Sequence, residues 1–312
     1  MDTNPSPDAP AQPSQQSLEA TLPGGSLDEQ ALRKIFGNAA DDLTVPTSVK
    51  EIFKSRLKTV GGDHRTLYLT ALIGLPIVGL IVGLAGSWGI GGFLIAISVI
   101  TVVAVLLVQN NRATSAFFEM YTTARGLQLR ENSGHGASVP LFTKGDKRKW
   151  HRVMTGTISD RPAALGHYTY TDVSTDSDGD KSETDYDFTF LAFELPPEVA
   201  ARFVGVYCAP KSISFGAMQD KLAHDRAVSF ESQALHGRYS IRVVDEQDDI
   251  ALFELFSPPF IEMLVDGAAV YWEQRGSDLV FWQKNHFNQV AKLDQFCMDS
   301  SYVLQRYLEE YQ

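Results

Sequence analysis

The chain has 312 residues, of which 44% are hydrophobic, and a net charge of −11 at pH 7. Residues 112–152 carry 8 bases against 3 acids, whereas residues 153–312 carry 12 bases against 26 acids. Because the long acidic part repels phosphate backbones, the composition excludes general nucleic-acid binding. The two cysteines, Cys208 and Cys297, lack the spacing of a zinc site, so we expect two buried thiols and no metal or cofactor.

The first 25 residues combine five prolines with serine, glutamine and aspartate, and they offer little apolar surface. Ordering such a segment costs entropy without a core in return, so residues 1–25 are predicted to be a disordered tail. Residues 26–65 are predicted to hold two juxtamembrane amphipathic helices. Each begins with a capping box, formed by Ser26 with Glu29 and by Ser48 with Glu51.

The second of these helices is basic. Its cations, which are candidate lipid contacts, are Lys50, Lys54, Arg56 and Lys58. A basic amphipathic helix can lie on anionic lipid headgroups, or its apolar face can pack against a soluble domain. The hydrophobic pattern does not identify the partner, so both interpretations stay open.

Residues 66–111 contain no Asp, Glu, Lys or Arg. Two apolar blocks, residues 67–84 and 90–108, are separated by only five residues. At about 1.5 Å of rise per residue, each block is about as long as the roughly 30 Å hydrocarbon core of a bilayer. The sequence therefore predicts a transmembrane helical hairpin over residues 66–111.

Cations flank the outer ends of both blocks and are absent from the turn between them. The first block is preceded by Lys50, Lys54, Arg56, Lys58 and Arg65, and the second is followed by Arg112, Arg125 and Arg130. By the positive-inside rule, both termini are cytoplasmic in a multi-pass protein of the cell inner (plasma) membrane. No ionisable side chain lies at membrane depth, which argues against an ion path or a transporter.

Gly79 and Gly83 form a G-x-x-x-G step in the first block. Small residues at this spacing let another helix approach closely. That helix is either the second block of the same chain or a block of a second copy, so a homo-oligomer is one of two interpretations.

Behind the hairpin, residues 112–130 are predicted to continue the second helix, and residues 131–139 to form a Gly/Ser-rich linker. Residues 140–312 are predicted to be one cytosolic α+β domain, an antiparallel sheet with helices on one face. Strands are predicted at residues 153–159, 164–172, 186–195, 203–208, 227–231, 239–244, 269–274 and 278–283. Helices are predicted at residues 215–224, from 250 to Pro258-Pro259, from there to Gly267, and from 290 to 308.

Two charged stretches of this domain are candidates for binding. In residues 172–185, Asp176, Asp178 and Asp180 fit the first three ligand positions of a calcium-binding loop. The glycine and the final glutamate that such a loop requires are not at the matching positions, so a solvated hairpin tip is favoured. The second stretch is basic and is a further candidate lipid contact, with strand-edge charge as the alternative. Its members are Lys147, Arg148, Lys149 and Trp150.

Catalytic motifs are absent from the sequence. The seven histidines show no H-x-x-x-H or H-E-x-x-H pair, and there is no G-x-S-x-G elbow, phosphate-binding loop or G-x-G-x-x-G turn. A site assembled from separated residues remains open, because such sites are recognised by geometry. The sequence nominates no catalytic residue.

Several short stretches carry a family resemblance. They are Met154-Thr155-Gly156, His167-Tyr168-Thr169-Tyr170, Phe230-Glu231-Ser232, Arg238-Tyr239-Ser240-Ile241-Arg242-Val243, an acidic run at residues 245–249, Ala251, and Phe256-Ser257-Pro258. From about residue 67 onward, the chain resembles uncharacterised bacterial membrane proteins with two spans and a C-terminal cytosolic domain of unknown function. Tyr239 stands where Phe is commoner in that family, and the acidic run is longer. The resemblance implies an anchored α+β module and no established activity.

The sequence favours a membrane-anchored cytosolic module without evident catalytic activity, which binds a protein partner or anionic lipid headgroups. One alternative is an enzyme at the inner membrane surface, with a site formed by residues distant in sequence. The other is an oligomeric membrane scaffold subunit that associates through Gly79 and Gly83.

Overall fold

The computed structural model describes residues 29–37, 45–63, 74–86, 88–130, 136–176, 178–211, 225–267 and 270–309. The predicted tail at residues 1–25 and the predicted helix at residues 215–224 lie outside these ranges, as do Ser26 and the first part of the first apolar block.

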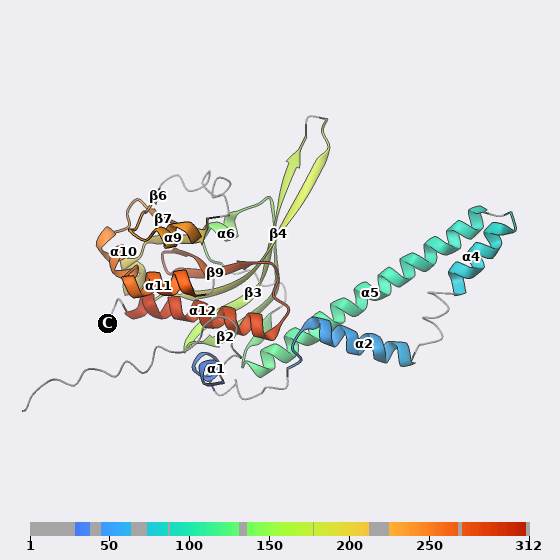
Figure 1. The fold of residues 1–312 in the computed structure, drawn as a ribbon, viewed down its shortest axis with the longest axis horizontal. Helices are drawn as coiled ribbons and strands as arrows, with labels where there is room; N and C mark the ends of the chain where they lie inside the picture. The colour runs from blue at the N-terminus through green and yellow to red at the C-terminus, as the bar shows by residue number, and fades with distance from the viewer. Residues whose placement is uncertain are drawn as a thin grey trace, which may run out of the picture.

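A nine-stranded sheet forms the centre of the described part of the chain (Figure 1). Its order is β1-β2-β3-β4-β9-β8-β5-β7-β6, and every neighbouring pair is antiparallel. The strands are β1 (Gln128–Arg130), β2 (Lys147–Ile158), β3 (Arg161–Thr175), β4 (Lys181–Glu194), β5 (Gly205–Pro210), β6 (Asp225–Ala227), β7 (Tyr239–Val244), β8 (Tyr271–Arg275) and β9 (Asp278–Lys284).

Helices cover both faces of the sheet unequally. The larger apolar core joins one face to side chains of α1 (Glu29–Phe36), α5 (Trp88–Ala124), α10 (Asp249–Leu255), α11 (Pro258–Asp266) and α12 (Val290–Glu309). The smaller core joins the other face to the four-residue helix α6 (Pro140–Thr143). Side chains of α2 (Val49–Asp63), α7 (Pro197–Arg202) and α9 (Gln233–Arg238) also belong to the larger core, and α4 (Leu75–Leu84) lies beside α5. The predicted α+β fold with an antiparallel sheet is therefore confirmed, with most helices on one face.

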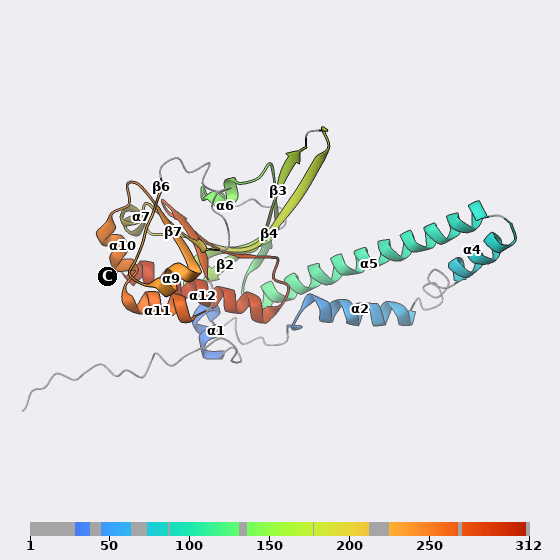
Figure 2. The ribbon, with the colours of Figure 1, turned by 45° about the horizontal axis from the view of Figure 1, so that its top comes forward.

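The hairpin of β3 and β4 is longer than predicted and extends beyond the sheet as an arm (Figures 1 and 2). Strand β2 pairs with β3 only as far as Thr171, and β9 pairs with β4 only from Phe188, so residues 172–175 and 181–184 pair only with each other. Tyr170 stacks on Tyr186 at 4.9 Å and on Phe188 at 5.5 Å between ring centroids, which stiffens the base of the arm.

Two predictions in the first half of the domain are wrong. The helix predicted over residues 112–130 ends at Ala124, because Gly126 has a φ of 65°, in the left-handed region that favours glycine. The Leu127 N–H donates to the Thr122 carbonyl at 2.8 Å, which completes a Schellman motif and turns the chain into β1. The basic stretch at residues 147–149 is the start of strand β2, six residues earlier than predicted, because it pairs with the extended β3.

Helix α5 is one continuous element of 37 residues with two different environments. In its first part, large apolar side chains are exposed, such as Ile90 at 60% and Ile100 at 67%. In its last part, Phe117, Phe118 and Tyr121 are fully buried against the sheet. Within the described residues, α5 is one helix that is long and apolar enough to cross a membrane. The apolar residues 89–108 correspond to about 30 Å of helix.

Helix α4 is the described part of the first predicted span. It has ten residues and lies beside α5 in both ribbon views (Figures 1 and 2). The two backbones approach closely at glycines: a Cβ on Gly79 would lie 2.7 Å from the Gly91 carbonyl oxygen, and a Cβ on Gly91 would lie 2.8 Å from the Gly83 nitrogen. Gly79 and Gly83 thus pack against α5 of the same chain. A helix of ten residues is about half the length of a span, so the described residues do not show the predicted two-span hairpin.

A buried ion pair fixes the end of α5 to α12. Arg125 donates to the two carboxylate oxygens of Asp294 at 3.1 and 2.6 Å, and both side chains are almost fully buried. The Tyr121 hydroxyl donates to the same carboxylate at 2.9 Å. The guanidinium also lies over the rings of Phe36 and Tyr121. Arg125, which the sequence places among the cations flanking the span, therefore belongs to the core.

We expect Asp294→Asn to destabilise the protein by about 3–5 kcal/mol, because it leaves the Arg125 charge buried without a counter-charge. Thermal unfolding of the purified full chain in detergent measures the change. Glu254→Gln is the matched control, because it removes an ion pair with Arg202 that is half exposed and worth about 1 kcal/mol or less. Equal effects of the two substitutions would contradict the role assigned to Asp294.

Candidate functional site

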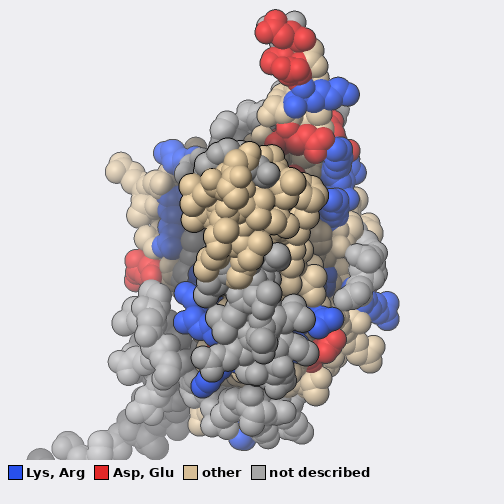
Figure 3. Space-filling model, turned by 90° about the vertical axis from the view of Figure 1, so that its right-hand side faces the viewer, with Lys and Arg blue, Asp and Glu red and all other residues tan. Residues whose placement is uncertain are grey.

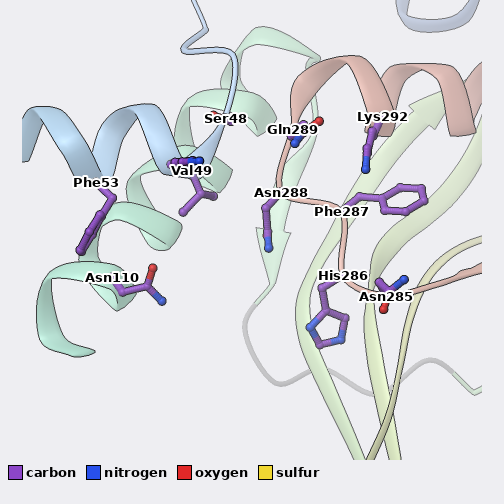
Figure 4. A pocket seen from close by; sticks show the side chains of 11 residues that line it. Ser48, Val49, Phe53, Asn110, Asn285, His286, Phe287, Asn288, Gln289 and Lys292 are labelled. Atoms are coloured by element: carbon purple, nitrogen blue, oxygen red, sulfur yellow. The ribbon is translucent and has the colours of Figure 1, made fainter. Parts of the chain in front are cut away.

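A polar pocket lies where α2, the middle of α5 and the start of α12 meet (Figure 4). Its volume is about 400 Å³. Three parts of the chain line the pocket. The α2 side contributes Ser48, Val49, Lys50 and Phe53, and α5 contributes Asn110. The segment between β9 and α12, together with the first turn of α12, contributes Asn285, His286, Phe287, Asn288, Gln289 and Lys292.

Backbone hydrogen bonds hold these segments together. The Val49 N–H donates to the Asn288 carbonyl at 3.0 Å, and the Val290 N–H donates to the Thr47 carbonyl at 3.1 Å. Ser48 and Gln289 form an isolated antiparallel bridge. The Ser48 hydroxyl also accepts from the Glu51 N–H at 3.3 Å, which is one half of the predicted capping box. The Glu51 carboxylate accepts from the Thr47 N–H at 2.9 Å, one residue before the position that a capping box requires. The start of each helix is thus fixed by the other.

The apolar face of α2 packs on the protein at its N-terminal end. Val49 and Ile52 are buried in the larger core, and Phe53 packs against it. Leu57 is 37% exposed, and Lys54 and Lys58 are exposed as well. Of the two interpretations of this helix, packing on the protein holds for its first half, whereas its second half presents cations and an apolar side chain to the surroundings.

The lining of the pocket is suited to an anion that also carries hydroxyl groups. Lys50 and Lys292 supply two ammonium groups, and the lining contains no Asp or Glu. The other polar groups are the carboxamides of Asn110, Asn285, Asn288 and Gln289 and the hydroxyl of Ser48, which can both donate and accept hydrogen bonds. Phosphate esters with a polyol or amine headgroup have this chemistry.

The position of the pocket along α5 is defined by Asn110. This side chain follows Val108, the last residue of the apolar stretch, by two positions. The pocket therefore opens at the level where the exposed apolar surface of α5 ends. Viewed toward the free end of α5, Lys and Arg side chains lie on both sides of the apolar helix, and acidic side chains gather on the β3–β4 arm (Figure 3).

Three histidines lie together behind the pocket. The rings of His167 and His286 stack in parallel with centroids 4.3 Å apart, and His151 lies 5.7 Å from His286. His167 Nε2 lies 3.1 Å from the Phe287 carbonyl oxygen, and His286 Nε2 lies 3.5 Å from an Asp187 carboxylate oxygen. Burial lowers the pKa of His167 well below 6.5 and lowers the pKa values of His151 and His286 as well.

This histidine cluster lacks the geometry of a metal site. No group of three or more His, Cys, Asp or Glu side chains in the described part of the chain is placed to hold a metal ion. Burial favours the neutral form of all three rings, and of the three only His286 lines the pocket.

The predicted lipid contacts on β2 have different environments. Lys147 forms an ion pair with Glu183 on the arm at 2.5 Å, the Arg148 Nε donates to the Lys144 carbonyl at 3.2 Å, and Lys149 is exposed. Trp150 is half-buried, with ring centroids 4.4 Å from Phe142 and 4.7 Å from Tyr168. On α2, Lys50, Lys54 and Lys58 are exposed and Arg56 is half-buried.

The acidic stretch at residues 172–185 forms the outer part of the arm, as the interpretation of a hairpin tip predicts. The Asp176 carboxylate accepts from the N–H groups of Asp178 at 3.0 Å and Asp180 at 2.9 Å. This carboxylate stabilises the turn in which Gly179 has a φ of +88°.

Sequence reasoning missed most of the pocket. Asn110 on α5 is far along the chain from His286 and Lys292, and these groups become neighbours only through tertiary structure. One local signal was available: residues 285–289 read Asn-His-Phe-Asn-Gln, a polar segment between a strand and a helix.

Comparison with known proteins does not assign a family. No protein-family model matches the chain, and no curated protein matches it. The crystal structure of the mycobacterial trehalose monomycolate transport factor A, TtfA, is similar with a TM-score of 0.44 and 10% sequence identity, over 64% of this chain and 96% of that chain. A likeness at this level establishes neither a common fold nor a common function. The resemblance to bacterial two-span membrane proteins stays a prediction.

We expect the contribution of His167 to the stability of the protein to decrease as the pH falls from 7.5 to 5. The folded-state pKa of His167 lies below its unfolded value, so its contribution is present above pH 6.5 and is lost as the pH falls through the folded pKa. The variant His167→Gln removes the proton that the unfolded chain takes up at this position between the two pKa values. It should reduce the slope of stability against pH by up to about 1.4 kcal/mol per pH unit.

Thermal unfolding midpoints of both proteins, measured at a series of pH values at constant ionic strength, test this expectation. Parallel pH profiles would show that His167 does not titrate in this range in either state.

Proposed function

We propose that this protein is a membrane-anchored cytosolic module that binds anionic lipid headgroups in the pocket between α2, α5 and α12. Residues 66–111 form a hairpin of two spans in the inner membrane, with both termini in the cytoplasm. The pocket receives a headgroup from the cytoplasmic leaflet, where Lys50 and Lys292 contact the phosphate and the carboxamides contact its polar substituent.

The continuity of α5 carries this proposal. The same helix presents about 30 Å of exposed apolar surface and, two residues later, contributes Asn110 to the pocket. If the apolar part is in the bilayer, the pocket lies at the headgroup level. The exposed cations Lys54 and Lys58 on α2 then lie beside the same surface and attract anionic lipid.

The packing of Gly79 and Gly83 favours this proposal over a scaffold that associates through these glycines. The backbone of α4 at these two glycines is in close contact with α5 of the same chain, so the surface that a second copy would use is already occupied.

The topology predicts that a cysteine at Ala85 reacts with a membrane-impermeant maleimide added outside intact cells, whereas a cysteine at Lys284 reacts only after the inner membrane is opened. The native Cys208 and Cys297 provide a low background, because both are buried and burial raises the pKa of each thiol.

The reverse labelling pattern would contradict this topology. Release of the protein from membranes by alkaline carbonate would contradict the membrane anchor itself.

The pocket predicts a specific effect of Lys50→Gln/Lys292→Gln on headgroup binding. Each lysine near an anionic headgroup is worth about 1 kcal/mol, so the double variant should bind dioctanoyl phosphatidylglycerol roughly 25-fold more weakly. Calorimetric titration of the full chain in a nonionic detergent measures the dissociation constant. Dioctanoyl phosphatidylcholine should bind more weakly than phosphatidylglycerol to the unchanged protein.

Lys34→Gln/Lys181→Gln is the matched control, because it makes the same change in net charge at two exposed positions outside the pocket. If this control weakens binding as much as the pocket variant, general electrostatic attraction accounts for binding and the proposed site is wrong.

A further inference from the structure

A second, apolar groove lies between α9, α10 and α11, at the end of the domain far from the free end of α5 (Figures 1 and 2). Its volume is about 680 Å³. The apolar lining consists of Phe230, Ala234, Phe253, Pro258, Ile261 and Val265. Phe253 is 54% exposed, which is unusual for an aromatic side chain of a folded domain.

The groove is held in shape by the core beneath it. Phe230 lies 4.7 Å from Phe256 and 5.7 Å from Phe253 between ring centroids, and Phe256 in turn stacks on the buried Trp272. The Ser232 hydroxyl caps α9 by accepting from the Leu235 N–H at 3.2 Å. The walls are therefore positioned before any partner arrives, which lowers the entropic cost of binding.

The rim of the groove is acidic. Glu231, Glu262 and Asp266 are exposed, and none forms an ion pair or a side-chain hydrogen bond with the described residues. The groove lining contains no Lys or Arg. The neighbouring Arg238 is engaged with the Val265 and Gly267 carbonyl groups at the end of α11. The groove thus combines an apolar floor with unneutralised negative charge.

We propose that this groove binds a cationic amphipathic segment of a partner protein. Apolar side chains of the segment fill the space around Phe253, and its Lys or Arg side chains pair with Glu231, Glu262 and Asp266. This is the mode in which an amphipathic helix lies in a hydrophobic groove. The inference goes beyond headgroup binding and does not depend on it.

Two other occupants fit less well. The bilayer is excluded by position, because the groove lies at the opposite end of the domain from the free end of α5. The 28 residues that precede α1 contain four acidic residues and no Lys or Arg, so the rim would repel them. A cationic segment is the occupant that matches both the floor and the rim.

The test uses the full chain in nanodiscs of neutral phosphatidylcholine and a fluorescein-labelled 15-residue helical peptide, with leucines on one face and lysines on the other. Fluorescence anisotropy, corrected by empty nanodiscs, should show saturable binding. A peptide with glutamate in place of each lysine should not bind. Absence of saturable binding by the lysine peptide would overturn the proposal.

Two variants locate the binding site. Glu231→Lys/Glu262→Lys/Asp266→Lys should weaken binding by about tenfold or more, since it reverses the charge of the rim. Phe253→Asp should have an effect of about the same size, because it puts a charge on the floor. Unchanged affinity in both variants would also overturn the proposal.

Matched controls separate groove binding from general effects. Glu194→Lys/Glu198→Lys/Glu246→Lys makes the same change in net charge at exposed positions outside the groove, and Ile250→Asp alters an exposed apolar side chain on α10 that does not line it. Both should keep the affinity of the unchanged protein. Lys50→Gln/Lys292→Gln should keep it too, so that failure of headgroup binding and failure of this proposal are distinguishable.

A second copy of the chain is the remaining occupant. Sedimentation of the unchanged protein and of Phe253→Asp in detergent tests it. A dimer that Phe253→Asp dissociates would assign the groove to self-association and overturn the proposal, whereas the same monomeric mass for both would support it.

Discussion

The buried pair of Arg125 and Asp294 is the constraint on which the rest of the structure depends. It joins residues 169 positions apart in the chain and binds the end of α5 to α12. A charge buried in this way needs its partner, so the orientation of α5 on the domain is fixed by the requirement that both groups remain paired. The ten or so residues of α5 that lie on the sheet then set the direction of the apolar part of the same rigid helix.

This constraint has a consequence for the pocket. Lys292 lies two residues before Asp294 on α12, and Asn110 lies on α5, the helix that Arg125 directly follows. The groups that pin α5 to α12 therefore also set the distance between the walls of the pocket. A pocket on flexible loops would lose entropy on binding, whereas the segments that form this one are already held together by the ion pair and by the backbone hydrogen bonds between residues 47–49 and 288–290.

Local signals explain which parts of the fold could be predicted. Strand β7 alternates buried and half-buried side chains along Tyr239–Val244, and the sequence predicts its bounds correctly. The break between α10 and α11 follows from Pro258 and Pro259. The extra length of the β3–β4 arm was not visible, because its residues pair only with each other and carry the polar side chains of a loop.

Long-range pairing explains what the sequence did not show. In the sequence, Arg125 is one of the cations that flank the apolar stretch, and only the structure shows that it pairs with the carboxylate of Asp294. His167 and His286 have no spacing relationship, yet their rings stack because β3 and the segment after β9 are brought together by the sheet. The groove between α9, α10 and α11 likewise has no motif, since exposed aromatic residues such as Phe253 look like core positions in an amphipathic pattern.

The two binding sites proposed for this protein lie at opposite ends of α12, and this separation keeps them independent. Lys292 lines the pocket near the first turn of the helix, and Arg306 donates to the Glu254 carbonyl of α10 at 2.9 Å near its end. Fourteen residues of helix correspond to about 21 Å, which is more than twice the Debye length of about 8 Å at physiological salt. At separations of this order, salt largely screens the acidic rim of the groove from the pocket and from an anionic membrane. A chain whose residues 153–312 carry 26 acids against 12 bases can in this way bind anionic lipid at one end and a cationic segment at the other.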